Sequence, residues 1–83
     1  MAYKEMFFVQ VFGLNSKKRL SLLATYPADS AERAVARASA YADRGAPGAI
    51  AFTQIIDEQA EDAMEPVLLA SFGQVPPEAR AAA

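Results

Sequence analysis

A single helix-forming segment lies between two pairs of strand-forming segments, and this order constrains the fold more than any other feature of the chain. Asp29 is a helix-capping residue type, and Glu32 follows it by three positions, which is the spacing of a capping box. Alanine-rich sequence continues to Arg44, and Gly45 stands where helices often end in a left-handed residue. The pattern predicts a helix from about Ser30 to Arg44.

The predicted helix has an apolar stripe and a basic stripe. At about 100° per residue, its small and apolar side chains share one side, which we expect to pack against a sheet. This stripe contains Ala31, Val35, Ala38 and Ala42, with Ala34 and Tyr41 beside it. The opposite stripe contains Arg33, Arg37 and Arg44. These arginines are candidates for binding an anion or an acidic partner, and the alternative interpretation is a solvated surface with local ion pairs.

Two strands are predicted before the helix, from Tyr3 to Leu14 and from about Arg19 to Tyr26, because both segments are rich in aromatic, β-branched or alternating apolar residues. Side chains alternate across a strand, so each face can be read from the sequence. In the first strand one face carries Phe7, Val9 and Val11, and the other carries Phe8, Gln10 and Phe12. In the second strand one face carries Leu20, Leu22, Ala24 and Tyr26, and the other carries Arg19, Ser21, Leu23 and Thr25.

Two further strands are predicted after the helix, from about Ala49 to Ile56 and from about Val67 to Val75, where Pro76 and Pro77 end the last one. In the third strand Ile50, Phe52, Gln54 and Ile56 share one face, and Ala49, Ala51, Thr53 and Ile55 share the other. In the fourth strand Leu68, Ala70 and Phe72 share a face. We expect residues 1–77 to form one domain and residues 78–83 to be a disordered tail.

The predicted fold class is α+β, with the order β-β-α-β-β and one helix on one face of a four-stranded sheet. A helix of about 15 residues rises about 22 Å, close to the length of a seven-residue strand. It can therefore return the chain so that the second and third strands run in the same direction. The first and third strands are the most apolar, which predicts the sheet order 2-1-3-4 with these two in the centre.

One helix leaves the other face of the sheet without a covering layer. Large apolar patches are uncommon on monomers and often mark interfaces. The candidate interface residues are Phe8, Gln10, Phe12 and Leu23. We expect this face to form a homodimer or to bind another protein, and the alternatives are that the tail folds over it or that it is semi-polar and hydrated.

The composition excludes several kinds of site. The chain has no cysteine and no histidine, so it has no disulfides, no Cys/His metal site and no Ser-His-Asp triad. A net charge of −2 argues against nucleic-acid binding. The glycines form neither a dinucleotide-binding nor a Walker pattern. We therefore predict no catalytic residue, no cofactor and no metal.

Charge is concentrated at two places in the sequence. Lys17, Lys18 and Arg19 follow the first strand, and the connector 57–65 carries five carboxylates. These are Asp57, Glu58, Glu61, Asp62 and Glu65. The connector lacks the pattern of an EF-hand, so we interpret it as a solvated loop. The predicted strand directions place the two charged segments at opposite ends of the molecule.

No apolar stretch approaches the roughly 20 residues that span a bilayer, and the run from Met6 to Leu14 lacks the features of a signal peptide. We therefore expect a cytoplasmic protein with no membrane contact.

Three segments of the chain, Phe7–Phe12, Ser30–Ala34 and Pro66–Pro76, together resemble a group of short bacterial proteins common in alphaproteobacteria. The resemblance covers most of the chain. It implies neither an activity nor a cofactor, because the group has no assigned function.

Two functional hypotheses follow from these features. The first is a non-enzymatic interaction module, a homodimer through its open sheet face. The second is a small-molecule-binding or cofactor-free enzymatic domain with a site at a sheet or dimer cleft, where Tyr26, Tyr41 or a buried carboxylate supplies the polar group.

Overall fold

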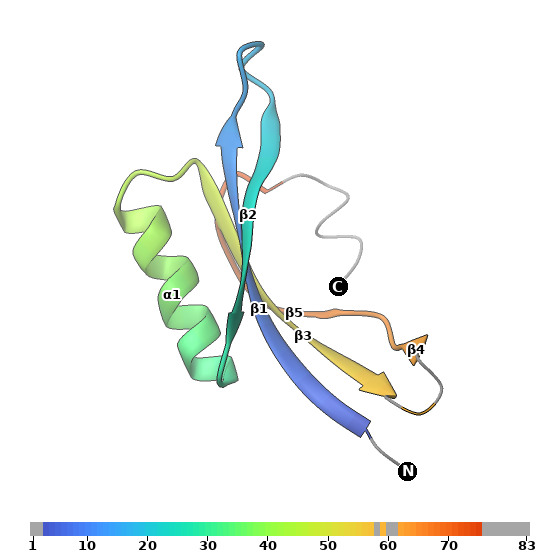
Figure 1. Ribbon diagram of the computed structural model, residues 1–83. Coiled ribbons are helices and arrows are strands. Elements are labelled where there is room, and N and C mark those ends of the chain that lie inside the picture. Colours follow the sequence, from blue (N-terminus) through green and yellow to red (C-terminus); the bar gives the residue numbers. More distant parts are fainter. Residues whose placement is uncertain (1–2, 58, 60–61, 76–83) are drawn as a thin grey trace.

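The computed structural model describes residues 3–57, 59 and 62–75, which form one antiparallel sheet with a helix on one side (Figure 1). The elements are β1 (Tyr3–Leu14), β2 (Leu20–Ala28), α1 (Ala31–Asp43), β3 (Gly48–Asp57), β4 (Asp62–Ala63) and β5 (Val67–Gly73). The sheet order is β2-β1-β3, and both β4 and β5 pair with the free side of β3. The predicted α+β class and strand order are confirmed. The two-residue strand β4 was not predicted and lies within the acidic connector.

The register fixes the two ends of the sheet. Leu14 pairs with Leu20 at one end of β1, and Tyr3 pairs with Asp57 at the other. The basic turn after β1 and the start of the acidic connector therefore lie at opposite ends of the molecule, as predicted. Glu58 and Glu61 of that connector lie outside the described residues, as does the predicted tail.

The core between α1 and the sheet is made of small side chains. Its buried members are Val9, Val11, Ala34, Ala38, Ala49 and Ala51. The largest fully buried side chain is Val9. Because alanine has little bulk, the helix can lie close to the centre of the sheet, but each buried methyl removes little apolar area from water.

The helix begins one residue later than the capping pattern predicted. Ser30, not Asp29, is the N-cap, since its Oγ accepts a hydrogen bond from the backbone N–H of Arg33 at 3.1 Å. Asp29 instead forms an ion pair with the Arg33 side chain at 3.3 Å. At the other end, Gly45 has a φ of 101°, which confirms the predicted glycine just beyond the helix.

The buried stripe of α1 is also rotated by about one residue from the prediction. Ala34 and Ala38 are fully buried, and Tyr41 packs beside them, whereas Ala31 and Ala42 are only half-buried. Tyr41 stacks on Tyr26 of β2, and this contact turns that flank of the helix toward the sheet. An alanine-rich helix offers several similar small stripes, so the aromatic contact decides among them.

A bulge in β2 corrects the predicted faces of that strand. Val11 pairs with Ala24 and Phe12 pairs with Leu22, so Leu23 is an extra residue without its own partner. The alternation changes phase at this point. Leu20 and Leu22 therefore lie on the face away from α1, while Ala24 and Tyr26 lie on the α1 side. The prediction that these four residues share one face is wrong.

A second bulge in β5 has the same effect. Ala51 pairs with Ala70 and Phe52 pairs with Leu68, which leaves Leu69 as the extra residue. Phe72 and Leu69 pack on the α1 side, but Leu68 packs on the opposite face. The predicted grouping of Leu68 with Ala70 and Phe72 is therefore wrong.

The last predicted strand ends two residues early. Gly73 has a φ of 71°, a conformation that side chains other than glycine rarely adopt, and β5 stops there. The backbone N–H of Gln74 then donates to the carbonyl of Pro47 at 2.8 Å. This turn brings Val75 against Phe12 and Ile50, on the sheet face that lacks a helix.

Candidate functional site

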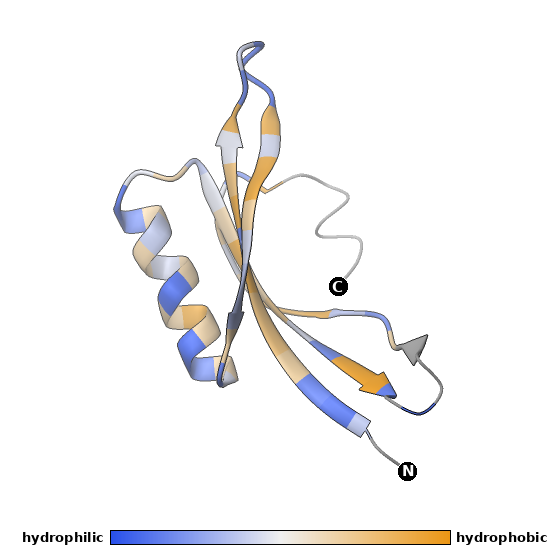
Figure 2. Ribbon diagram, viewed as in Figure 1, coloured by the Kyte–Doolittle hydropathy of each residue, from blue (hydrophilic) through white to orange (hydrophobic). Residues whose placement is uncertain are grey.

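The face of the sheet opposite α1, called here the open face, is built by alternate residues of four strands. Phe8, Gln10 and Phe12 of β1 face the same way as Ile50 and Phe52 of β3, because directly paired residues of an antiparallel sheet share a face. The neighbouring strands add Leu20, Leu22 and Leu68. Figure 2 shows hydrophobic residues along β1, β2 and β3 and a hydrophilic turn at the tip of the β1–β2 hairpin.

An aromatic pair lies on the open face between the two central strands. The rings of Phe8 and Phe52 stack with their centroids 5.4 Å apart. Both side chains are half-buried. Val75, Phe12 and Ile50 form a small buried cluster on the same face, with Leu20 and Leu68 packed against it. The chain therefore covers part of the open face with its own residues and leaves the rest accessible.

The accessible part of the open face is apolar and almost free of charge. Leu14 and Leu22 are 51% and 52% exposed. Among the described strand residues on this face, Lys4, near the start of β1, carries the only charge. Gln54 donates from its side chain to the carbonyl of Met64 at 3.1 Å, at the acidic end of the sheet. Such a surface is typical of protein contacts rather than of a chemical site.

Three of the four predicted interface residues lie together on this face, and one does not. Phe8, Gln10 and Phe12 are neighbours on β1. The Leu23 side chain lies on the α1 side, where its Cδ1 occupies the space beside Gly13 that a Cβ would take. Leu23 is 65% exposed there.

Sequence reasoning missed Phe52, Leu22 and Leu68 as members of the face. The period-two pattern of the third strand already grouped Ile50 with Phe52, and the predicted strand order would have placed both beside Phe8. Leu22 and Leu68 had no such signal, because each reaches the open face only through a bulge.

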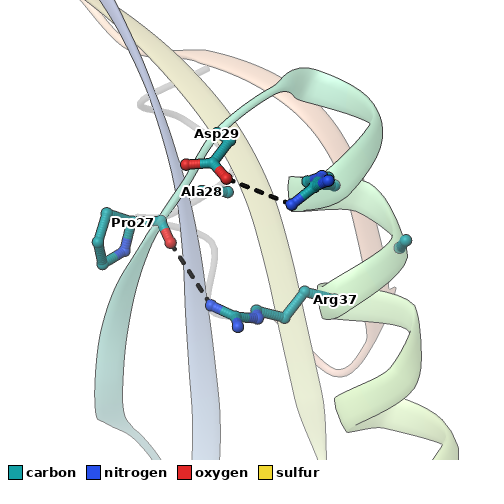
Figure 3. A pocket seen from close by; sticks show the side chains of 6 residues that line it. Pro27, Ala28, Asp29 and Arg37 are labelled. Atoms are coloured by element: carbon teal, nitrogen blue, oxygen red, sulfur yellow. Dashed lines mark hydrogen bonds and ion pairs between the residues drawn. The ribbon is translucent and has the colours of Figure 1, made fainter.

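The predicted basic stripe lies on the flank of α1 that faces β2. Arg33, Arg37 and Arg44 are all exposed. Arg37 Nη1 donates to the carbonyl of Pro27 at 3.5 Å, which bridges the helix and the end of β2 (Figure 3). The stripe is therefore held against the sheet at its middle residue.

Two adjoining hollows lie along this flank and share Ala36 and Arg37. The first, of about 410 Å³, is lined also by Pro27, Ala28, Asp29 and Arg33 (Figure 3). The second, of about 400 Å³, is lined also by Ala40, Tyr41 and Arg44. Arg37 stands between them because it lines both.

A tyrosine pair lies beside this region, and its helix member, Tyr41, lines the second hollow. Tyr26 and Tyr41 stack with centroids 5.6 Å apart and ring planes 8° from parallel. A hydrogen bond with the Tyr41 hydroxyl raises the pKa of Tyr26 above its usual value, and the Arg37 guanidinium partly opposes this shift. The two tyrosines that sequence reasoning singled out are thus brought together.

A third hollow, of about 590 Å³, lies between α1 and β5 on the other flank of the helix. Val35, Leu69 and Phe72 give it a mainly apolar lining. It is shallow, and Glu32 and Ser39 are the polar members of its lining.

Within residues 3–57, 59 and 62–75, no cluster of carboxylates is arranged to hold a metal ion. In the same part of the chain, α1 is too short and too polar to cross a bilayer. Comparisons with protein-family models, with curated proteins and with solved structures found no match.

Proposed function

We propose that this protein is a non-enzymatic interaction module that forms a homodimer through its open face. The observation that supports this proposal is an accessible, apolar sheet face with the Phe8–Phe52 pair near its middle and Leu14 and Leu22 about half exposed. Burial of these side chains against a second copy would remove them from water.

The absence of charge on most of this face favours a second copy of the chain as the occupant. Each copy carries a net charge of −2, so two copies repel one another overall. Two open faces related by a two-fold axis meet where the described strands carry little charge, and their leucine and phenylalanine side chains contact apolar partners.

The size of the face also suits a dimer. Four strands about 4.8 Å apart and up to 12 residues long present a face of roughly 19 Å by 40 Å. A standard interface takes about 800 Å² of accessible surface from each partner. The planar area of the open face, roughly 760 Å² before the relief of its side chains is counted, is close to that share.

Pairing through the sheet edges is a less favourable route to association. Both outer strands, β2 and β5, contain a bulge, and bulges interrupt the row of free backbone groups that another strand would need. Pro27 removes a further donor from β2. The face, not the edge, is therefore the proposed contact.

The test is the solution mass measured by size-exclusion chromatography with light scattering at two protein concentrations. We expect a mass near twice 8.9 kDa for the native chain. Leu22→Lys places a charge on the open face and should yield a monomer. Leu23→Lys is the matched control, because it makes the same change at an exposed neighbour on the other side of the sheet.

A native chain that is monomeric at both concentrations contradicts the homodimer. Equal dissociation by Leu22→Lys and Leu23→Lys would show that the contact does not use the open face. Far-ultraviolet circular dichroism of each variant shows whether a loss of dimer is instead a loss of fold.

The bacterial cytoplasm is the proposed location of this module. The absence of cysteine supports a fold that does not depend on an oxidising compartment. The resemblance to short bacterial proteins supports a bacterial origin for the chain. Fractionation of cells that express the tagged chain tests the location, and recovery in the membrane or periplasmic fraction would contradict it.

A further inference from the structure

The hollow between Arg37 and Arg44 has the volume of a small ligand site. Ala36 and Ala40 also line it, and their short side chains leave space between the two arginines. Its volume of about 400 Å³ lies in the range of roughly 300–1,000 Å³ that is usual for small-molecule pockets.

The charge of this hollow is uncompensated, unlike that of its neighbour. Among residues 3–57, 59 and 62–75 no carboxylate lines it, whereas Asp29 lines the adjoining hollow and pairs with Arg33. The Arg44 side chain makes no hydrogen bond or ion pair with the described residues. Two guanidinium groups therefore border a space that holds no negative partner from this part of the chain.

The contact with β2 positions Arg37 and occupies only part of its hydrogen-bonding capacity. One Nη1 bond of 3.5 Å to the Pro27 carbonyl anchors its guanidinium. A guanidinium has five N–H donors, so several remain for an anion. Because the anchor is a backbone atom at the end of a strand, less side-chain freedom would be lost on binding.

Tyr41 adds a neutral donor at the same place. Tyr41 lines the hollow and stacks on Tyr26, with their ring centroids 5.6 Å apart. A tyrosine hydroxyl has one hydrogen to donate, so Tyr41 can supply a neutral donor to an anion in the hollow.

We propose that the hollow bounded by Arg37, Tyr41 and Arg44 binds a phosphate group. Two guanidinium groups match a dianionic oxyanion, and planar guanidinium donors suit phosphate oxygens. This inference is independent of the proposed dimer, because α1 and the open face lie on opposite sides of the sheet.

The experiment is a titration of isotope-labelled protein with inorganic phosphate at constant ionic strength, followed by the amide and guanidinium resonances. We expect saturable shifts centred on Arg37, Tyr41 and Arg44. Arg37→Gln and Arg44→Gln should each weaken binding about fivefold, a typical effect of losing one partly exposed charge contact.

Arg33→Gln is the matched control, since it removes the same charge from the same helix flank but lines only the adjoining hollow. It should weaken phosphate binding less than about twofold, because its charge is already paired with Asp29. Equal weakening by all three variants would show general attraction to a basic helix and overturn the site. Shifts that never saturate, or no shifts, would overturn it too.

A second titration distinguishes free phosphate from a phosphate ester as the ligand. A nucleoside monophosphate carries the same group on a larger body that can contact the exposed edge of Tyr26, which is 37% accessible. Tighter binding than inorganic phosphate, still lost in Arg44→Gln, supports an ester. Equal affinity supports the free ion. Binding of the ester that is unaffected by Arg44→Gln would contradict the site.

Discussion

At the residue scale, single side chains decide which local alternative the chain adopts. Ser30 caps the helix although Asp29 is the residue three positions before Glu32, and Asp29 is then free to pair with Arg33. Tyr41 turns the helix by stacking on Tyr26. Each outcome follows from a contact with a partner whose position the sequence pattern does not specify.

The tyrosine pair predicts a pH dependence of stability. The pKa of Tyr26 is raised in the folded chain, chiefly by its hydrogen bond with Tyr41. The stabilisation from this bond is therefore full below the usual tyrosine pKa of about 10 and is lost as the pH rises through the raised pKa. Arg37, which faces the pair, lowers the pKa of Tyr26 and reduces the effect.

Tyr41→Phe tests this argument because it keeps the aromatic stack and removes the hydroxyl. We expect the pKa of Tyr26, followed by tyrosinate absorbance, to fall toward its usual value. Tyr3→Phe serves as the spectral control, since it removes a tyrosine from the far end of β1. A titration of Tyr26 that is unchanged in Tyr41→Phe would mean that burial, not the hydrogen bond, sets the pKa.

At the scale of elements, the local sequence largely accounts for where the strands and the helix form. It does not account for which side chains lie on each face of them. β1 has the predicted bounds, and its alternation matches the two sides of the sheet. β2 and β5 each contain one extra residue, which reverses the alternation partway along the strand. Phe8, Phe12, Ile50 and Phe52 of the central strands form the apolar middle of the open face, and the outer strands add Leu22 and Leu68 beside them.

Two variants test whether Ser30 is the helix N-cap. Ser30→Ala removes the acceptor for the Arg33 N–H and should lower the free energy of unfolding by about 1 kcal/mol. Asp29→Ala breaks only an exposed ion pair and should cost less, at most a few tenths of a kcal/mol. Urea unfolding measures the free energy of unfolding of both variants. A larger loss in Asp29→Ala than in Ser30→Ala would show that Asp29 is the cap.

At the scale of the whole molecule, the chain is extended and its core is thin. The radius of gyration is 13.3 Å, compared with about 12 Å for a compact domain of this length. Val9 is the largest fully buried side chain. A fold with so little buried volume is a natural candidate for stabilisation by association.

This shape predicts a melting temperature that depends on protein concentration. If the dimer unfolds in one step, a tenfold increase in concentration should raise Tm by about 3–6 °C. Leu22→Lys should abolish the dependence, and Leu23→Lys should keep it. Calorimetry at two concentrations makes the measurement, and a native Tm that does not change would show that the open face contributes nothing to stability through self-association.

The sequence by itself determined the helix and the four longer strands of this protein, their order and the composition of the two central strands. Propensity, capping residues and the period of two in β1 and β3 are local properties, so they could be read without a structure. The order β2-β1-β3 followed from strand apolarity and helix length. Phe8, Gln10 and Phe12 were found in this way.

Only the tertiary structure decided the phase of the outer strands, the buried stripe of the helix and the placement of Val75. A bulge at Leu23 or Leu69 depends on how a strand fits the twist of its neighbour, and neither position carries a glycine or other local signal. The helix has several alanine stripes of similar size, and the stripe that faces the sheet is the one compatible with the stacking of Tyr41 on Tyr26. Contacts between distant residues settle such choices, because the local sequence leaves the alternatives nearly equal in free energy.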